Sequence, residues 1–300
     1  MNKIYLAKYI AVIVLLCIIG LTSCKEKNVK KEEVKEMTVA DSLKEALTFY
    51  ASFDTGVNAD FSVGDSLMYT VADRSALDSS KVGLHKADIS RQKGKGKYGD
   101  GLQFTERSKG YIYYPSAGNI AYSEKNWNGA ISFWLSLDPA TDLEPGYCDP
   151  IQITDVTYND AAIWVDFTQN NPRDFRLGMI GDRNIWNPEG LEDEEDLFLP
   201  QLVPVKDPPF AKGEWTHILI NFSGLNTEKG EASLYINGEL KGTRANITDP
   251  FSWELDRSNI FLGLSYIGLM DDLSIYNKAL SQSEIDALYS LENGVQTVLE

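Results

Sequence analysis

Apolar and polar residues alternate in short stretches along most of the chain, and a period of two predicts β-strands with one buried face. In the clearest stretch, Ile131, Phe133 and Leu135 fall on one face and the residues between them on the other. The same pattern predicts strands at 49–53, 111–114, 151–154, 161–168, 175–180, 218–222 and 232–236. Asn237-Gly238, which follows the last of these, is typical of a two-residue type I′ hairpin. Short strands separated by turns predict one antiparallel β-sandwich.

A helical pattern occurs near the C-terminus, directly after a predicted strand. Ser281 and Glu284 have the Ser-x-x-Glu spacing of a capping box, and apolar residues then recur at helical spacing. A short helix is therefore predicted to close the fold. In the preceding strand, counting in twos places Asp271 on the same buried face as Leu273 and Ile275.

Two long stretches lack a clear pattern. Residues 64–97 are polar, and we expect them to cross the surface with one or two short strands. Residues 181–213 contain the acidic run 192–196 and several prolines, so we expect an irregular loop in which no strand lasts. A loop of this length is usually functional or disordered.

The first residues have the pattern of a bacterial lipoprotein signal peptide. Lys3 and Lys8 precede an apolar run at 10–19 that is short for a membrane span. The sequence Leu-Thr-Ser-Cys that ends at Cys24 looks like a lipobox, so we expect residues 1–23 to be removed and Cys24 to carry the lipid. The alternative is an ordinary secretory signal or an anchor helix in which this cysteine is incidental.

The segment after the cysteine is charged and has almost nothing to bury. We interpret residues 24–45 as a flexible tether and residues 46–293 as the globular domain. Lys25 stands where many inner-membrane lipoproteins have Asp, which favours the outer membrane. The expected location is therefore lipid-anchored on that membrane, at the cell surface or on the periplasmic face.

Composition limits the partners. The chain has 300 residues, of which 43% are apolar, enough for a large core, and its formal net charge is −16. This charge disfavours nucleic acid and is consistent with cation binding. Cys17 lies in the signal peptide and Cys24 carries the lipid, which leaves Cys148 without a disulfide partner.

The segment at 268–285 carries a specific resemblance to a known family. The matching residues are Gly268, Leu269, Met270, Asp271, Asp272, Ile275, Tyr276, Asn277, Ala279, Leu280, Ser281, Glu284 and Ile285. They resemble the end of laminin-G-like jelly-roll domains, in the concanavalin A-like lectin/glucanase superfamily, although Asp272 stands where that family usually has Glu. The segments 52–54, 99–104 and 234–238 resemble the family as well. The resemblance implies an all-β, two-sheet antiparallel jelly-roll sandwich with a short C-terminal helix.

Four oxygen-bearing residues are candidates for a metal site. Asp54 follows the first predicted strand and Asp271 lies in the last, and the terminal strands of a jelly roll commonly pair. Asn58 and Asp60 come from the same turn as Asp54. Oxygen ligands without His or Cys suit Ca²⁺ rather than zinc, and the resemblance implies a structural calcium. The alternative is that Asp54 caps the turn and Asp271 accepts backbone N–H groups.

A second candidate site lies on the outward face of one sheet. Ile163, Val165 and Phe167 are expected to face the core, so the residues between them point away from it. An exposed tryptophan beside polar side chains is what a sugar needs. By parity, the residues that could form this glycan-binding face are Trp134, Gln152, Trp164, Asp166 and Arg176. The alternative is that the long loops cover these side chains, which then form a minor core.

No catalytic motif is recognisable. The Glu-x-Asp-x-x-Glu strand of glycanases in this superfamily is absent, and so is a Ser-His-Asp pattern. We therefore predict a lipid-anchored protein whose domain binds carbohydrate without catalysis. The alternatives are a glycoside hydrolase or polysaccharide lyase whose residues are unfamiliar, and a protein-contact module of an envelope complex.

Overall fold

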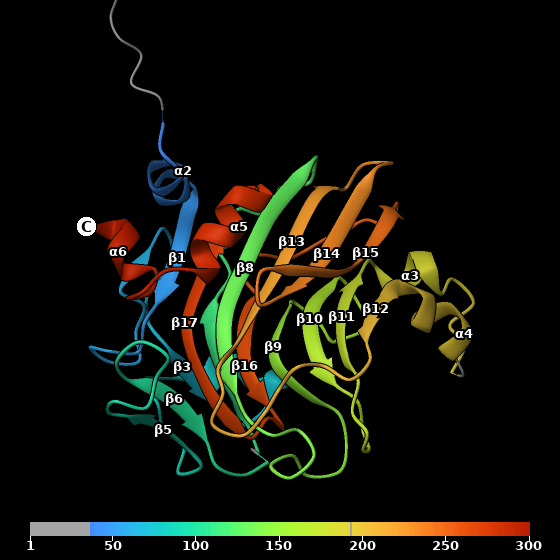
Figure 1. Cartoon of the computed structure of the whole chain (residues 1–300). Helices are drawn as coiled ribbons and strands as arrows, with labels where there is room; N and C mark the ends of the chain where they lie inside the picture. Colours follow the sequence, from blue (N-terminus) through green and yellow to red (C-terminus); the bar gives the residue numbers. More distant parts are fainter. Residues whose placement is uncertain (1–36, 108, 193) are drawn as a thin grey trace, which may run out of the picture. The chain divides into compact units, whose positions relative to one another are not determined.

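The computed structural model of the chain describes residues 37–107, 109–192 and 194–300, which form two packed antiparallel sheets (Figure 1). Sheet A contains, in spatial order, β15 (Glu239–Ile247), β14 (Gly230–Ile236), β13 (Thr216–Leu225), β8 (Trp127–Ser136), β17 (Gly268–Tyr276), β1 (Leu47–Ala51) and β2 (Phe61–Ser62), with β6 (Gly101–Phe104) on β17 and β5 (Ile89–Gln92) on β6. Sheet B contains β12 (Leu202–Val205), β11 (Phe175–Ile180), β10 (Ala162–Phe167), β9 (Cys148–Thr154), β16 (Asn259–Leu264), β7 (Tyr111–Pro115), β3 (Tyr69–Val71) and β4 (Lys81–Val82). The predicted two-sheet antiparallel sandwich is confirmed.

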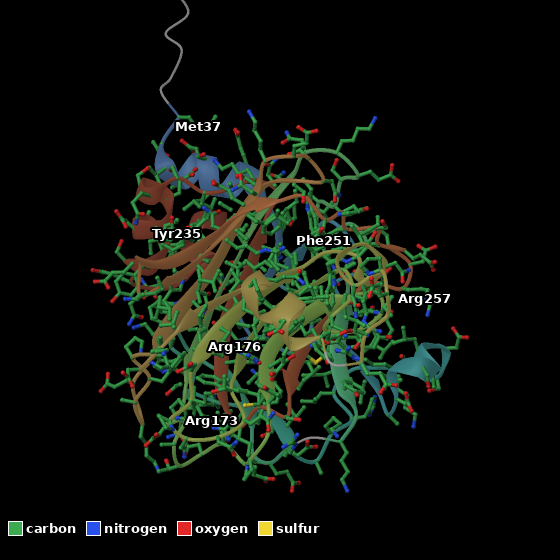
Figure 2. The ribbon with its side chains drawn as sticks, turned by 90° about the vertical axis from the view of Figure 1, so that its right-hand side faces the viewer. Met37, Arg173, Arg176, Tyr235, Phe251 and Arg257 are labelled. Carbon is green, nitrogen blue, oxygen red and sulfur yellow. The ribbon has the colours of Figure 1, made fainter. Side chains whose placement is uncertain are left out.

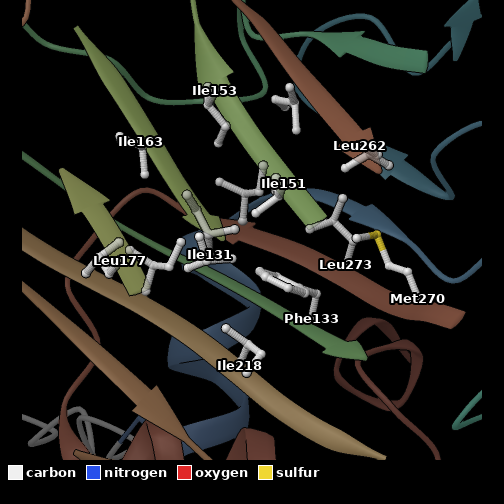
Figure 3. Close-up of a cluster of buried hydrophobic side chains, with 14 of the residues drawn as sticks. Ile131, Phe133, Ile151, Ile153, Ile163, Leu177, Ile218, Leu262, Met270 and Leu273 are labelled. Carbon is white, nitrogen blue, oxygen red and sulfur yellow. The ribbon is translucent and has the colours of Figure 1, made fainter. Parts of the chain in front are cut away.

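The core lies between the inner faces of the two sheets. Ile163, Val165 and Phe167 are fully buried in it, as their alternation predicts. Figure 3 shows apolar side chains from both sheets meeting in this layer, among them Phe133 from β8 and Ile151 from β9. Each such side chain contributes about 1.5–3 kcal/mol when it leaves water, and this apolar layer fixes the two sheets face to face.

The terminal strands pair as expected, and the predicted turn chemistry is present. Strand β1 lies antiparallel to β17, with Phe49 opposite Ile275. Asn237 and Gly238 both have positive φ, 54° and 78°, as a type I′ turn requires. The closing helix α5 (Gln282–Tyr289) begins with the predicted capping box.

The predicted face of Asp271 is wrong, because β17 contains a bulge. The register against β8 shifts between Asp271 and Ser274, and Asp272 has a φ of +52°. The extra residue reverses the alternation, so Met270 shares the inner face with Leu273 while Asp271 lies opposite Trp134. A bulge of this kind cannot be seen in a count by twos.

Three helices cover the outer face of sheet A: α2 (Val39–Ala46), α5 and α6 (Gln296–Leu299) (Figure 1). Thr38 caps α2 with a capping box, and Leu43 and Ala46 of this helix are buried. The tether predicted for 24–45 therefore gives way to the folded domain earlier than expected, and the domain continues beyond 293. Residues 1–36, with the predicted signal peptide and Cys24, lie outside the described residues. No helix in the described part is long and apolar enough to cross a membrane.

The two stretches without pattern contain more structure than predicted. Residues 64–97 hold β3, the 3-10 helix η1 (Arg74–Ser79), β4 and β5. Residues 181–213, here called the insertion, hold α3 (Arg183–Trp186), α4 (Glu195–Phe198), the 3-10 helix η2 (Leu199–Gln201) and β12. Strand β12 tolerates Pro204 because it lies at the edge of sheet B.

Candidate functional site

The outer face of sheet B brings together four of the five residues predicted for a glycan-binding face. In the sheet register, Gln152 of β9 lies opposite Trp164 of β10. Asp166 of β10 lies opposite Arg176 of β11. Parity along each strand places all four side chains on one face, and the antiparallel pairing makes them neighbours. Figure 2 views this side of the molecule and labels Arg176 on it.

A cavity of about 530 Å³ opens above these residues, within the size range of small-molecule sites. The strands supply its floor, and the β9–β10 connection and the insertion supply its walls. The lining residues are Tyr147, Asp149, Gln152, Tyr158, Trp164, Asp166, Arg176, Glu192, Glu194, Glu195, Phe198 and Leu199. The insertion therefore forms part of this site.

The floor of the cavity is polar and firmly held. Arg176 donates two hydrogen bonds to Asp166, Nε to Oδ1 at 2.9 Å and Nη2 to Oδ2 at 2.5 Å. Both side chains are buried, and this two-bond geometry is what a buried ion pair needs to offset its desolvation. Gln152 donates from Nε2 to Asp149 Oδ2 at 2.6 Å, while its buried Oε1 has no hydrogen-bond partner.

Asp149 is the unusual carboxyl group of the floor. Within the described residues Asp149 forms no ion pair, whereas Asp166 pairs with Arg176. Burial, reinforced by the neighbouring carboxylate of Asp166, raises the pKa of Asp149 to about 8. Asp149 therefore favours its protonated form at neutral pH, and its carboxyl group can interact with a ligand in addition to accepting from Gln152.

Trp164 is not the open platform expected from parity, because only 2% of it is exposed. One side of its ring packs against Gly178, where an added Cβ would lie 2.2 Å from ring atoms. Phe198 of the insertion stacks on the ring at 6.2 Å between centroids. The indole N–H donates to the backbone oxygen of Tyr158 at 2.7 Å. The structure therefore supports the alternative, a minor core beneath the insertion, with Trp164 at the edge of the cavity floor where the insertion packs on it.

Two exposed tyrosines, Tyr147 and Tyr158, contribute aromatic rings to this cavity, and the sequence pattern did not predict either of them. Tyr147 is 45% exposed and Tyr158 is 47% exposed, and both line the cavity. The guanidinium of Arg176 lies 5.0 Å from the centre of the Tyr147 ring, which helps to orient that ring. Tyr147 lies directly before β9, and Tyr158 lies in the loop between β9 and β10. The alternation of apolar and polar residues does not predict the exposure of residues in loops. An aromatic residue in such a loop was the available signal.

The acidic run of the insertion contributes to the wall. Glu194 accepts from Arg183 at 2.7 Å and from Asn159 and Asn187, and although burial opposes it these hydrogen bonds lower the pKa of Glu194. Glu192 and Glu195 also line the cavity, and both are exposed.

Trp134, the fifth predicted residue, lies on the other sheet. It points outward from β8 in sheet A, but helix α5 covers it, so that only 3% is exposed. Tyr289 stacks on its ring at 5.9 Å, and the Lys97 ammonium lies 4.5 Å from the ring centre. Trp134 is therefore separate from the sheet B cavity.

The predicted metal residues are partly brought together. Asp54 Oδ1 accepts from Asp100 N at 2.6 Å, and Asp271 Oδ2 accepts from Tyr98 N at 2.9 Å, so one loop holds both carboxylates. Asp271 Oδ1 is buried without a partner, and burial raises the pKa of Asp271 to about 8.

The other two predicted ligands are occupied by other donors. Asn58 Oδ1 accepts from Met68 N at 3.1 Å, and Asp60 Oδ2 accepts from Ser52 N at 2.7 Å. In the part of the chain that the structure describes, no three or more His, Cys, Asp or Glu side chains form a metal-binding group. The structure therefore brings Asp54 and Asp271 to one loop and gives Asn58 and Asp60 other partners.

Comparison with known families identifies the fold. Residues 108–286 match the laminin-G-type family model described as the concanavalin A-like lectin/glucanases superfamily. This chain belongs to the concanavalin A-like lectin/glucanase superfamily. Members of a fold family carry different functions, so the membership establishes the architecture and leaves the role to the site. No curated protein matches the sequence.

Solved structures of the superfamily fold include carbohydrate complexes. Domain 4 of AbnA, a GH43 extracellular arabinanase from Geobacillus stearothermophilus, solved with arabinotriose, is 18% identical and has a TM-score of 0.50, with 82% of this chain and 98% of that chain covered. The ligand-binding domain of botulinum neurotoxin serotype D, solved with N-acetylneuraminic acid, is 17% identical and has a TM-score of 0.52. This match covers 84% of the present chain and about half, 52%, of the toxin chain. At these identities the likeness is one of fold.

Proposed function

We propose that this protein is a lipid-anchored envelope protein whose domain binds carbohydrate at the sheet B cavity without catalysing a reaction on it. The observation that carries the proposal is the combination of two exposed tyrosine rings, Tyr147 and Tyr158, with a fixed polar floor. Sugars present apolar C–H faces that pack on aromatic rings, and hydroxyl groups that need hydrogen-bond partners in fixed positions. The arabinotriose and N-acetylneuraminic acid complexes of proteins with the same fold support the same ligand class.

The floor would bind hydroxyl groups with little rearrangement. Arg176 is held by Asp166, which keeps its remaining N–H groups in a defined direction. Gln152 offers Oε1, which lacks a partner, and Asp149 offers a carboxyl group that can donate as well as accept when protonated. A preorganised site of this kind loses little conformational entropy on binding.

Mutation of the two rim tyrosines tests the proposal. Each tyrosine is nearly half exposed, so Tyr147→Ala and Tyr158→Ala should leave stability within about 0.5 kcal/mol of the wild type. Each should weaken binding of a cognate oligosaccharide at least about tenfold, or 1.4 kcal/mol. Tyr289→Ala is the matched control, because Tyr289 is 41% exposed and packs on Trp134 of the opposite sheet. Unchanged affinity in both rim variants would remove the cavity as the binding site.

Glycoside hydrolysis is a second candidate, favoured by the protonated Asp149 in the cavity. A hydrolase needs a general acid and a second, ionised carboxylate free to act. The neighbouring Asp166 has both oxygens bonded to Arg176, so it is poorly placed to act as nucleophile or base. Glu192 and Glu195 also line the cavity, but they are exposed side chains of the insertion that no hydrogen bond within the described residues holds in a fixed position. Incubation of the protein with the oligosaccharide that it binds should therefore release no reducing ends; release that Asp149→Asn abolishes would establish the enzyme instead.

Two further parts of the proposal concern the anchor and calcium. The lipobox motif that ends at Cys24 supports lipid attachment at that residue and an outer-membrane location. The unpartnered, buried Oδ1 of Asp271 supports a Ca²⁺ ion held by Asp54 and Asp271, because a buried carboxylate oxygen needs a cation or a donor. Bound calcium would neutralise these carboxylates and stabilise the pairing of the first and last strands.

A further inference from the structure

Acidic residues outnumber basic residues among the described residues that line the sheet B cavity. Five lining residues are acidic (Asp149, Asp166, Glu192, Glu194 and Glu195), and among the described lining residues the cation is Arg176. Arg176 is already neutralised by the two hydrogen bonds to Asp166, and Glu194 by Arg183 at 2.7 Å. Asp149, Glu192 and Glu195 form no ion pair within the part of the chain that is described. The described residues that line the cavity therefore include unpaired carboxyl groups and no unpaired cation.

An independent observation indicates which kind of group the cavity lacks. Gln152 lines the cavity, is only 3% exposed, and has a buried Oε1 without a hydrogen-bond partner. An amide oxygen only accepts hydrogen bonds. The unsatisfied groups of the site, the Gln152 oxygen and the unpaired carboxyl groups, thus call for a ligand rich in donors. An ammonium group has three donors, no acceptor and a positive charge.

We propose that the cavity selects glycans by charge, and that its preferred ligand is a sugar with a free, protonated amine rather than the N-acetylated form of the same sugar. This inference rests on the proposed carbohydrate function and specifies its ligand class. An anionic sugar would meet Glu192 and Glu195 with no free cation to compensate, so the site rejects uronic acids and sulfated glycans.

Binding of the amine should release a proton from the floor. The groups that face Asp149 are Gln152 on its own strand, Asp166 of β10, Arg176 of β11 and Arg74 of η1. Asp149 is protonated below its pKa of about 8 in the free protein. A cation beside a carboxyl group favours the charged form and lowers its pKa, so the proton leaves when the ammonium binds. A neutral sugar would produce no such release.

Isothermal titration calorimetry on the purified full-length protein tests the inference, with three tetrasaccharides as probes. They are the glucosamine tetramer, the N-acetylglucosamine tetramer and the galacturonate tetramer, at about pH 6, because the sugar oxygens lower the pKa of these amines below that of lysine and the amines must be protonated. We expect the glucosamine tetramer to bind about tenfold more tightly than the N-acetylated one and the galacturonate tetramer not to bind. The enthalpy of the glucosamine titration should depend on the ionisation enthalpy of the buffer, which reports proton release.

Variants separate the charge selection from folding effects. Glu192→Gln with Glu195→Gln changes two exposed side chains and should reduce the tenfold preference to threefold or less. Asp149→Asn should remove the buffer dependence. Asp196→Asn is the control, since Asp196 belongs to the same acidic run but does not line the cavity, and it should change neither quantity.

Two outcomes would overturn the inference at different levels. Equal or tighter binding of the N-acetylated tetramer, or any binding of the galacturonate tetramer that depends on Tyr147 and Tyr158, would refute charge selection and leave the carbohydrate proposal standing. If no tetrasaccharide binds at any charge and a broader glycan panel is also negative, the proposed function fails together with this inference.

Discussion

Truncation of Trp164 distinguishes a structural role for this residue from direct contact with a ligand. The ring is 2% exposed and packs between Gly178 and Phe198, in a cluster with Trp186 and Leu202. Trp164→Ala would leave a cavity between sheet B and the insertion, and would also remove the indole hydrogen bond to the Tyr158 backbone oxygen. Substitutions of this kind cost about 3–5 kcal/mol.

The expected loss is large enough to measure by thermal unfolding. For a chain of this size, 1 kcal/mol corresponds to about 2–4 °C, so Trp164→Ala should lower the melting temperature by roughly 6–20 °C. Circular dichroism on the variant and on the exposed-rim control Tyr147→Ala provides the comparison, and the control should melt within about 2 °C of the wild type. A Trp164→Ala variant that melts with the wild type would show that the insertion does not pack on this ring, and the described cavity wall would be wrong.

Three further predictions follow from the anchor, the calcium residues and a buried histidine. Cys24→Ser should move the protein from the membrane pellet to the soluble fraction while its melting temperature stays unchanged; continued pelleting would refute the lipid anchor. Calcium at a hundred times its dissociation constant should add about 2.7 kcal/mol to the free energy of unfolding, and the Asp271→Asn variant should lose most of that increase. If a chelator leaves the melting temperature of the wild type unchanged, Asp271 has only a hydrogen-bonding role. Burial lowers the pKa of His217 to about 3, so folding favours its neutral form; stability should fall as pH drops from about 6.5, the unfolded pKa, toward 3. His217→Gln should flatten that part of the pH profile, and an unchanged profile would contradict the buried, neutral histidine.

The period of two along each strand predicted which side chains point away from the core, but not which other segments cover those side chains. Trp134 and Trp164 both point outward, as their neighbours in sequence require, yet α5 covers the first and the insertion covers the second. Whether an outward face meets solvent depends on packing between segments far apart in sequence. The sequence pattern therefore placed Gln152, Asp166 and Arg176 correctly beside each other and misjudged the exposure of the tryptophan.

The remaining differences have local causes that a regular pattern cannot contain. The bulge at Asp271 and Asp272 reversed the expected face of the first of these residues, since one additional residue shifts every side chain that follows. Tyr147 and Tyr158 lie in loops, where neither period applies, so their approach to the cavity depends on the tertiary fold. The family motifs at the C-terminus, by contrast, sit in a strand pair and a capped helix whose geometry is set locally, and these were predicted well.

Carbohydrate binding at the sheet B cavity can be tested by a crystal structure of this protein with an oligosaccharide selected on a glycan array. We expect a sugar ring packed on Tyr147 or Tyr158, with its polar groups bonded to Gln152, Asp149 or Arg176 on the floor of the sheet B cavity. A sugar bound at another surface of the sandwich, with this cavity occupied only by water, would contradict it.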